Sequence, residues 1–149
     1  MKNRNAVKFW MVVMVLPLLL ANGTPVTAGA VENLPVQADW TLMVYIVGDN
    51  NLDEYVPLDI ETELAPVGSN ADVSVVALAD RAATAEWTQT LLFYVTQGMP
   101  ATPEAAVEDW GEANMGDPAT LLTFIRWAPE NSPAAHYAVS LWNHGWSWR

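Results

Sequence analysis

His144 has the sequence setting of a catalytic base. An imidazole titrates near neutral pH, so it can accept a proton in a hydrolytic reaction and return it. His144 follows an apolar run that ends at Trp142, and the backbone N–H of Gly145 could approach a developing oxyanion closely. The same pattern fits a buried histidine satisfied by a carbonyl group. The other histidine, His136, opens the same run and is predicted to be structural.

Two more polar clusters follow apolar runs. Asp49, Asn50 and Asn51 come after one run, and Asp80 with Arg81 ends another. Their side chains could coordinate a hard cation such as Ca²⁺ or orient a catalytic group. Gly-Asp-Asn-Asn is also ordinary turn sequence, which is the favoured interpretation of the first cluster. Asp80 and Arg81 could simply pair with neighbouring groups at a strand end.

Other nucleophiles and cofactor motifs are absent or badly placed. The sequence contains no cysteine, and Ser147 lies only three residues from His144, whereas catalytic pairs usually come from separate elements. There is no zinc-ligand spacing, no phosphate-binding glycine loop and no Gly-x-Ser-x-Gly motif. A metal-dependent hydrolase that uses Asp49, Asp80 and His144 stays open as one hypothesis.

Three continuous apolar runs predict strands that are buried on both faces, as in parallel sheets covered by helices. They span residues 41–47, 72–80 and 135–142. Residues 89–96 are rich in Thr and in apolar and aromatic residues, which predicts an edge strand or half of a hairpin. Residues 100–110 are acidic, contain proline and are predicted to be a loop.

Two helices are predicted between these strands. Val56, Ile60 and Leu64 recur at a spacing of four before a stop at residues 66–68. Asp117 should cap the second helix, with proline at its first position and an end at about residue 127, before the next proline. The order strand, helix, strand, strand, helix, strand predicts a mostly parallel sheet with helices on both faces. The three polar clusters should therefore share the rim where the strands end, which is where such sheets bind ligands.

The first 30 residues predict a cleaved signal peptide. A basic start precedes an apolar run at residues 9–20, and Ala28, Gly29 and Ala30 are the small residues that precede a cleavage site. The run is shorter than the roughly 20 apolar residues of a membrane span. We expect export to the cell envelope or the extracellular space, no membrane span after cleavage, and a short leader at residues 31–39.

The part after the signal peptide is strongly acidic. Residues 31–149 contain three basic and seventeen acidic residues, a formal net charge of −14. This charge repels nucleic acid and attracts cationic peptides or divalent cations, although acidic surfaces also serve solubility. Because export would permit disulfides and the chain has none, its stability must come from core packing, metal or additional sequence.

Four segments resemble the start of the clostripain family of cysteine peptidases. In order they read WTLMVYIVGDNNL (residues 40–52), VVALADR (75–81), NMGDPATL (114–121) and LWNHG (141–145), within a match from Trp40 to Arg149. The resemblance implies a caspase-like three-layer α/β sandwich over residues 40–149 and a His-then-Cys dyad. In it His144 is the catalytic histidine, the N–H of Gly145 belongs to the oxyanion hole, and peptides are cleaved after Arg or Lys. Calcium dependence is a further property of family members.

The sequence also departs from the family pattern. In the related caspases the histidine lies about 50 residues before the cysteine, whereas five residues follow His144 here. Many relatives continue His-Gly-x-Gly-Trp, and this chain reads HGWSW at residues 144–148. We therefore expect the amino-terminal part of a peptidase, from an interrupted reading frame or a longer precursor, that is inactive alone. The alternative is a non-catalytic exported binding module in which Trp146 and Trp148 stack on a sugar or peptide.

Overall fold

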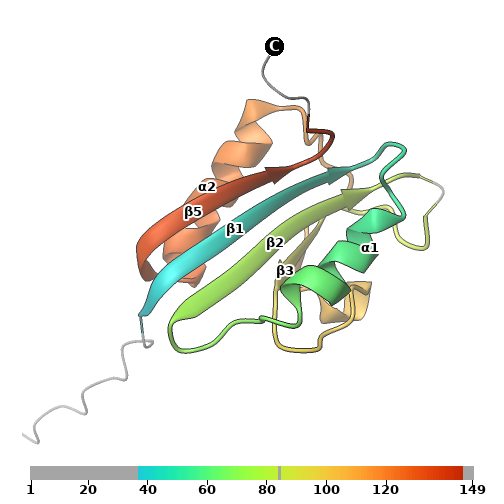
Figure 1. Ribbon diagram of the computed structural model, residues 1–149. Helices are drawn as coiled ribbons and strands as arrows, with labels where there is room; N and C mark the ends of the chain where they lie inside the picture. Colours follow the sequence, from blue (N-terminus) through green and yellow to red (C-terminus); the bar gives the residue numbers. More distant parts are fainter. Residues whose placement is uncertain (1–36, 84, 146–149) are drawn as a thin grey trace, which may run out of the picture. The chain divides into compact units, whose positions relative to one another are not determined.

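A five-stranded mixed sheet forms the centre of the structure, a computed structural model that describes residues 37–83 and 85–145 (Figure 1). Its three long strands are β1 (Ala38–Gly48), β2 (Val73–Arg81) and β5 (Ala134–Trp142). β1 lies between the other two and is parallel to both, in the order β4-β3-β2-β1-β5. The prediction of parallel long strands is confirmed, and β1 begins three residues before the predicted strand at residues 41–47.

The other two strands are short and antiparallel. β3 (Leu91–Tyr94) pairs with β2, and β4 (Glu108–Asp109) pairs with β3. Residues 89–96 thus supply one strand of an antiparallel pair. The predicted loop at residues 100–110 is wrong in two places, because it contains β4 and the 3₁₀ turn η2 (Pro103–Ala105). A two-residue exposed strand has no hydrophobic alternation by which a sequence could reveal it.

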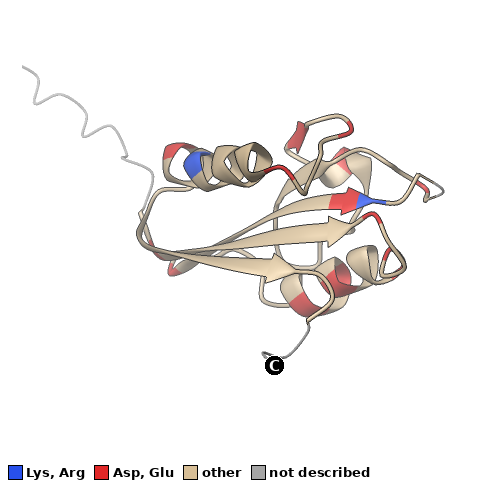
Figure 2. Cartoon of the chain, turned by 90° about the horizontal axis from the view of Figure 1, so that it is seen from above, with Lys and Arg blue, Asp and Glu red and all other residues tan. Residues whose placement is uncertain are grey.

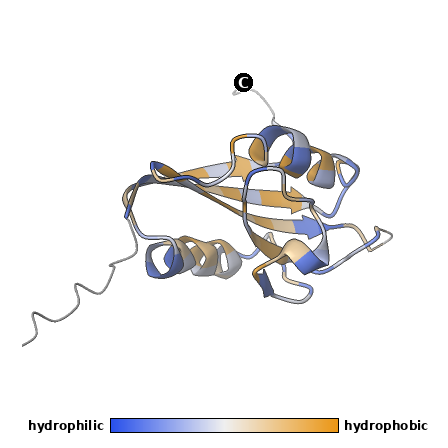
Figure 3. Ribbon diagram, turned by 90° about the horizontal axis from the view of Figure 1, so that it is seen from below, coloured by the Kyte–Doolittle hydropathy of each residue, from blue (hydrophilic) through white to orange (hydrophobic). Residues whose placement is uncertain are grey.

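Helices cover both faces of the sheet, as predicted (Figures 1 and 3). On one face α2 (Pro118–Asn131) buries Phe124 and Ala128 against alternate residues of the strands. On the other face lie α1 (Tyr55–Asp59) and the π-helical turn η1 (Ile60–Leu64). The alternation of a strand divides β1 between two cores: Met43 and Tyr45 face α2, while Val44 and Ile46 face α1.

The start of α2 agrees with its prediction and its end does not. Asp117 caps the helix, with Oδ1 accepting the N–H of Ala119 at 2.8 Å. The helix continues past the expected end through Pro129 to Asn131. A proline in the last turn removes a single hydrogen bond there, and Asn131 Nδ2 donates to the carbonyl of Trp127 at 2.9 Å.

β5 lies at the edge of the sheet and is largely exposed, so the prediction of a third buried strand is wrong for the described part of the chain. The exposed fractions of Tyr137, Val139 and Leu141 are 38%, 44% and 66%. These side chains share the α2 face of the sheet, opposite Thr41, Met43 and Tyr45 of β1. Apolar composition predicted burial, but β1 is the single neighbour of β5 among the described strands.

The predicted signal peptide lies outside the described residues, as does most of the predicted leader. Within the described ranges, none of the helices is both long enough and apolar enough to cross a membrane.

Gly48 should be intolerant of a side chain. A Cβ there would fall on Cγ2 of Val56 and 2.5 Å from the carbonyl oxygen of Asp80. We expect Gly48→Ala to lower the free energy of unfolding by about 1–3 kcal/mol through overpacking, measured by urea denaturation. Gly116→Ala is the control, because its Cβ would meet only Asn114 Oδ1 at 3.2 Å. Equal losses in the two variants would contradict this account of the β1–α1 packing.

Candidate active site

The carboxyl ends of the three parallel strands meet at one edge of the sheet, called the rim below. The register pairs Gly48 with Arg81 and Ile46 with Trp142, so β1, β2 and β5 end close together. The polar clusters at residues 49–51, 80–81 and 143–145 therefore share the rim, as predicted.

His144 lies just beyond β5, where it meets the turn that follows β1. Its Nε2 is 2.9 Å from Oδ1 of Asn51. The residue is exposed, so the alternative of a buried histidine satisfied by a carbonyl group is wrong. A ring in this position is accessible to a substrate and already has a partner for one nitrogen.

The β1–α1 turn is closed by Asn50. Its Nδ2 donates to the carbonyl of Val47 at 2.8 Å, and its Oδ1 accepts the N–H of Leu52 at 2.8 Å. The interpretation of this cluster as a turn is correct for Asn50. Because Asn50 takes up the backbone groups, the side chain of Asn51 is left to face His144.

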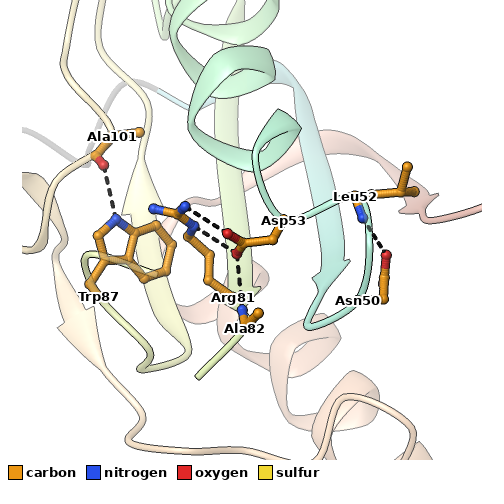
Figure 4. A network of polar contacts seen from close by, with 7 residues as sticks. All are labelled: Asn50, Leu52, Asp53, Arg81, Ala82, Trp87 and Ala101. Atoms are coloured by element: carbon orange, nitrogen blue, oxygen red, sulfur yellow. Dashed lines mark hydrogen bonds and ion pairs between the residues drawn. The ribbon is translucent and has the colours of Figure 1, made fainter. Parts of the chain in front are cut away.

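A partly buried ion pair ties this turn to the end of β2 (Figure 4). Arg81 donates from Nε to Oδ1 of Asp53 at 3.0 Å and from Nη2 to Oδ2 at 2.9 Å. The N–H of Ala82 also donates to Oδ1, at 2.9 Å, and the guanidinium lies 5.1 Å from the ring centroid of Trp87. Burial raises the pKa of Asp53, but the hydrogen bonds and charge of Arg81 and the N–H of Ala82 hold it below its usual value.

A second contact ties α1 to the end of β5. Trp142 Nε1 donates to Oδ2 of Asp59 at 2.7 Å, across 83 positions of sequence. Trp142 is two residues before His144, so this bond sets where β5 ends relative to the β1–α1 turn. The interpretation of Arg81 as paired with a neighbouring group is correct, but neither its partner Asp53 nor the Asp59–Trp142 bond was predicted. Helical spacing could have indicated that Asp59 lies above the sheet, but nothing in the sequence pairs it with Trp142.

A hollow of about 370 Å³, called the acidic hollow below, opens at the rim on the α2 face. It is lined by Val47, Asp49, Asp80 and residues 112–116. Asp80 is 4% exposed, and its Oδ1 accepts the hydroxyl of Thr90 at 2.8 Å. Burial, with the charges of Glu112 and Asp49, raises the pKa of Asp80 to about 6, although the Thr90 bond opposes the shift. Glu112 was missed from the sequence because its loop has no periodicity.

The described residues do not bring Asp49, Asp80 and His144 together as metal ligands. Over residues 37–83 and 85–145, no group of three His, Cys, Asp or Glu side chains is arranged to hold a metal ion. The hypothesis of a metal-dependent hydrolase therefore has no ligand set in this part of the chain. The same residues also offer no carboxylate or imidazole cluster for the calcium that the family resemblance implied.

The remaining predicted residues have different outcomes. His136 lies at the far end of β5, where its ring is 4.8 Å from that of Trp40, in agreement with a structural role. A Cβ on Gly145 would have no heavy atom within 4 Å, so its place in an oxyanion hole stays a prediction. Ser147 and the tryptophans at 146 and 148 lie outside the described residues.

The raised pKa of Asp80 predicts a pH-dependent effect of Asp80→Asn. The folded state holds a proton on Asp80 up to about pH 6, whereas the unfolded chain releases it near the ordinary value of 3.8. The carboxyl thus destabilises the fold increasingly between these pH values and fully above them. We expect Asp80→Asn to raise the free energy of unfolding by on the order of 1–3 kcal/mol at pH 7.5. The gain should shrink as the pH falls towards 4.

Urea denaturation at a series of pH values measures this effect, with Asp72→Asn at an exposed position as the control. Thr90→Val should lower the free energy of unfolding at pH 7.5. It removes the hydrogen bond that stabilises the carboxylate of Asp80 and so raises the pKa of Asp80 further. A gain from Asp80→Asn that does not change with pH would contradict the assignment.

Comparison with known proteins identifies the family of this chain. The model of the Clostripain family matches residues 44–149. Clostripain from Hathewaya histolytica is 29% identical over an alignment of 121 positions, which covers 70% of this chain and 23% of that protein. The chain thus spans about a quarter of the length of this curated relative.

Two solved structures share the fold. A cysteine protease of B. fragilis matches with a TM-score of 0.57 and 19% identity, over 74% of this chain and 92% of the other. A clostripain from Bacteroides thetaiotaomicron, crystallised with a peptide inhibitor, matches with a TM-score of 0.58 and 14% identity, over 76% and 96%. With the family match over more than two thirds of its length, the chain belongs to the clostripain family of cysteine peptidases.

Proposed function

We propose that this chain is the histidine-bearing, amino-terminal part of an exported cysteine endopeptidase with a caspase-like fold. The nucleophile belongs to polypeptide outside these 149 residues, which contain no cysteine. One observation carries the proposal: His144 follows an edge strand, β5, whose outer side has no neighbour among the described strands. Family membership supports peptides as substrates.

The spacing of a sheet explains how the dyad would form. Neighbouring strands lie about 4.8 Å apart, so a cysteine at the end of a parallel strand beside β5 would come within reach of the His144 ring. The thiol would then pass its proton to the imidazole, and the thiolate would attack the carbonyl carbon of the scissile bond. The imidazolium would return the proton to the leaving amine, and water would hydrolyse the thioester. The N–H of Gly145 is the proposed donor to the oxyanion.

The acidic hollow supports cleavage after Arg or Lys. Asp49, Asp80 and Glu112 line it at the rim. In the described residues the basic side chains are Arg81, which Asp53 already neutralises, and Arg126 (Figure 2). A cationic substrate side chain would therefore meet little competition from the chain's own cations.

Activity should require both His144 and a cysteine from outside this chain. Alone, the chain should not cleave an Arg-containing reporter peptide, with or without Ca²⁺. Expressed together with the polypeptide encoded downstream of codon 149, it should cleave the peptide, and a thiol alkylator should abolish the cleavage. His144→Ala should lower kcat by on the order of 10²–10⁴, while His136→Ala, at the far end of β5, should retain activity.

Two results would count against this function. One is turnover by the chain alone that alkylation leaves untouched. The other is a downstream sequence without a cysteine codon within roughly 60 codons, a window scaled from the spacing in caspases.

Export is part of the proposal and has its own test. The protein should be recovered outside the cytoplasm with Val31 as its first residue, as read by amino-terminal sequencing. Replacing Ala28 and Ala30 with bulky charged residues should block this processing, whereas Ala21→Leu should leave it intact. An unprocessed amino terminus on the wild-type protein recovered outside the cytoplasm would contradict the predicted cleavage.

A further inference from the structure

We infer that Asn51 is a positioning residue for His144. The carbonyl oxygen of its side chain, Oδ1, lies 2.9 Å from Nε2 of the imidazole. With the proton on Nε2, the ring donates to Asn51 and keeps a lone pair on Nδ1. Nδ1 is then the single ring atom that can accept the proton of a nucleophile. The inference rests on the proposed role of His144 as a general base.

Asn51 is held in place from two sides. Asn50 closes the turn through the carbonyl of Val47 and the N–H of Leu52. Two residues after Asn51, the carboxylate of Asp53 accepts bonds from Arg81 and from the N–H of Ala82 at the end of β2. The amide of Asn51 therefore projects from a turn that is anchored to the sheet.

His144 is held in a comparable way. The N–H of His144 donates to Oδ1 of Asn143, and the indole of Trp142 donates to Asp59 of α1 at 2.7 Å. Because α1 follows directly after the turn that carries Asn51, the Asp59–Trp142 bond fixes the distance between the two partners. The contact between residues 51 and 144 therefore follows from anchors on both of its sides.

An amide oxygen suits this role chemically. A histidine ring must present the correct tautomer, and the partner of its other nitrogen sets which nitrogen carries the proton. A carboxylate would do the same but would also stabilise the imidazolium. Asn51 fixes the tautomer without adding charge to a rim that already carries Asp49, Asp80 and Glu112.

NMR spectra of the ring nitrogens test the contact in this chain without any need for activity. At pH 8 the ¹⁵N shifts of His144 should show the proton on Nε2 to a greater extent than in a free histidine side chain, which already favours that nitrogen. Asn51→Ala should move both shifts towards those of a free histidine side chain, and Asn51→Asp, which keeps an acceptor oxygen, should preserve them. The signals of His136 report in the same spectra that each variant is folded.

Asn70→Ala is the matched control. Asn70 is likewise a turn asparagine, whose Oδ1 accepts the N–H groups of Asp72 and Val73, but it precedes β2 at the opposite end of the parallel strands. Its removal should leave the His144 shifts unchanged. A wild-type ring with its proton mainly on Nδ1, or shifts that Asn51→Ala does not move, would overturn the inference.

The complemented peptidase gives a second readout. Asn51→Ala should lower kcat by on the order of 10- to 100-fold, less than the 10²–10⁴ of proton transfer itself, with KM changed little. Asn51→Asp should restore part of the loss and alter the pH profile of kcat. An unchanged kcat in Asn51→Ala would overturn the positioning role. Full activity in His144→Ala would instead refute the proposed function, and the tautomer measurement would still report on the contact.

Discussion

The parallel pairing of β1 on both of its sides is the constraint on which the rest of the structure depends. Because β2 and β5 flank β1 in the same direction, their carboxyl ends meet at one rim. Parallel neighbours require crossover connections, which α1 with η1 and α2 provide on opposite faces. Asn51 and His144, 93 positions apart in the sequence, come into contact only because both crossovers return the chain to the same edge.

Strand alternation at the end of β2 separates two adjacent charges. Arg81 turns to the α1 face, where Asp53 neutralises it through two hydrogen bonds. Asp80 turns to the α2 face, where its carboxyl accepts a hydrogen bond from the neutral hydroxyl of Thr90. There it is also repelled by the charges of Glu112 and Asp49. The first residue therefore stabilises the turn behind the site, and the second leaves uncompensated charge in the acidic hollow. A strongly raised pKa in a hollow at the rim is typical of a functional site.

The sequence predicted those features that depend on local patterns. Apolar runs located the three long strands, the Asp117-Pro118 pair located the start of α2, and the strand ends located the rim. The errors have a common cause, which is that local pattern does not record neighbours. β4 is too short to show alternation, and Pro129 did not end α2 because the last turn tolerates it. Contacts between distant residues, such as Asp53 with Arg81 or Asp59 with Trp142, could not be predicted, because the sequence does not distinguish these two aspartates from the other acidic residues as partners.

The incorrect prediction for β5 bears on function. Its apolar side chains indicated burial, yet Leu141 is 66% exposed. Exposed apolar surface forfeits about 25 cal/mol for each Å² that could be buried, and an uncovered strand edge is prone to pair with other chains. A parallel strand beside β5 would remove both liabilities. In the proposed enzyme such a strand would also end next to His144, so a single segment would both cover the sheet and supply the thiol.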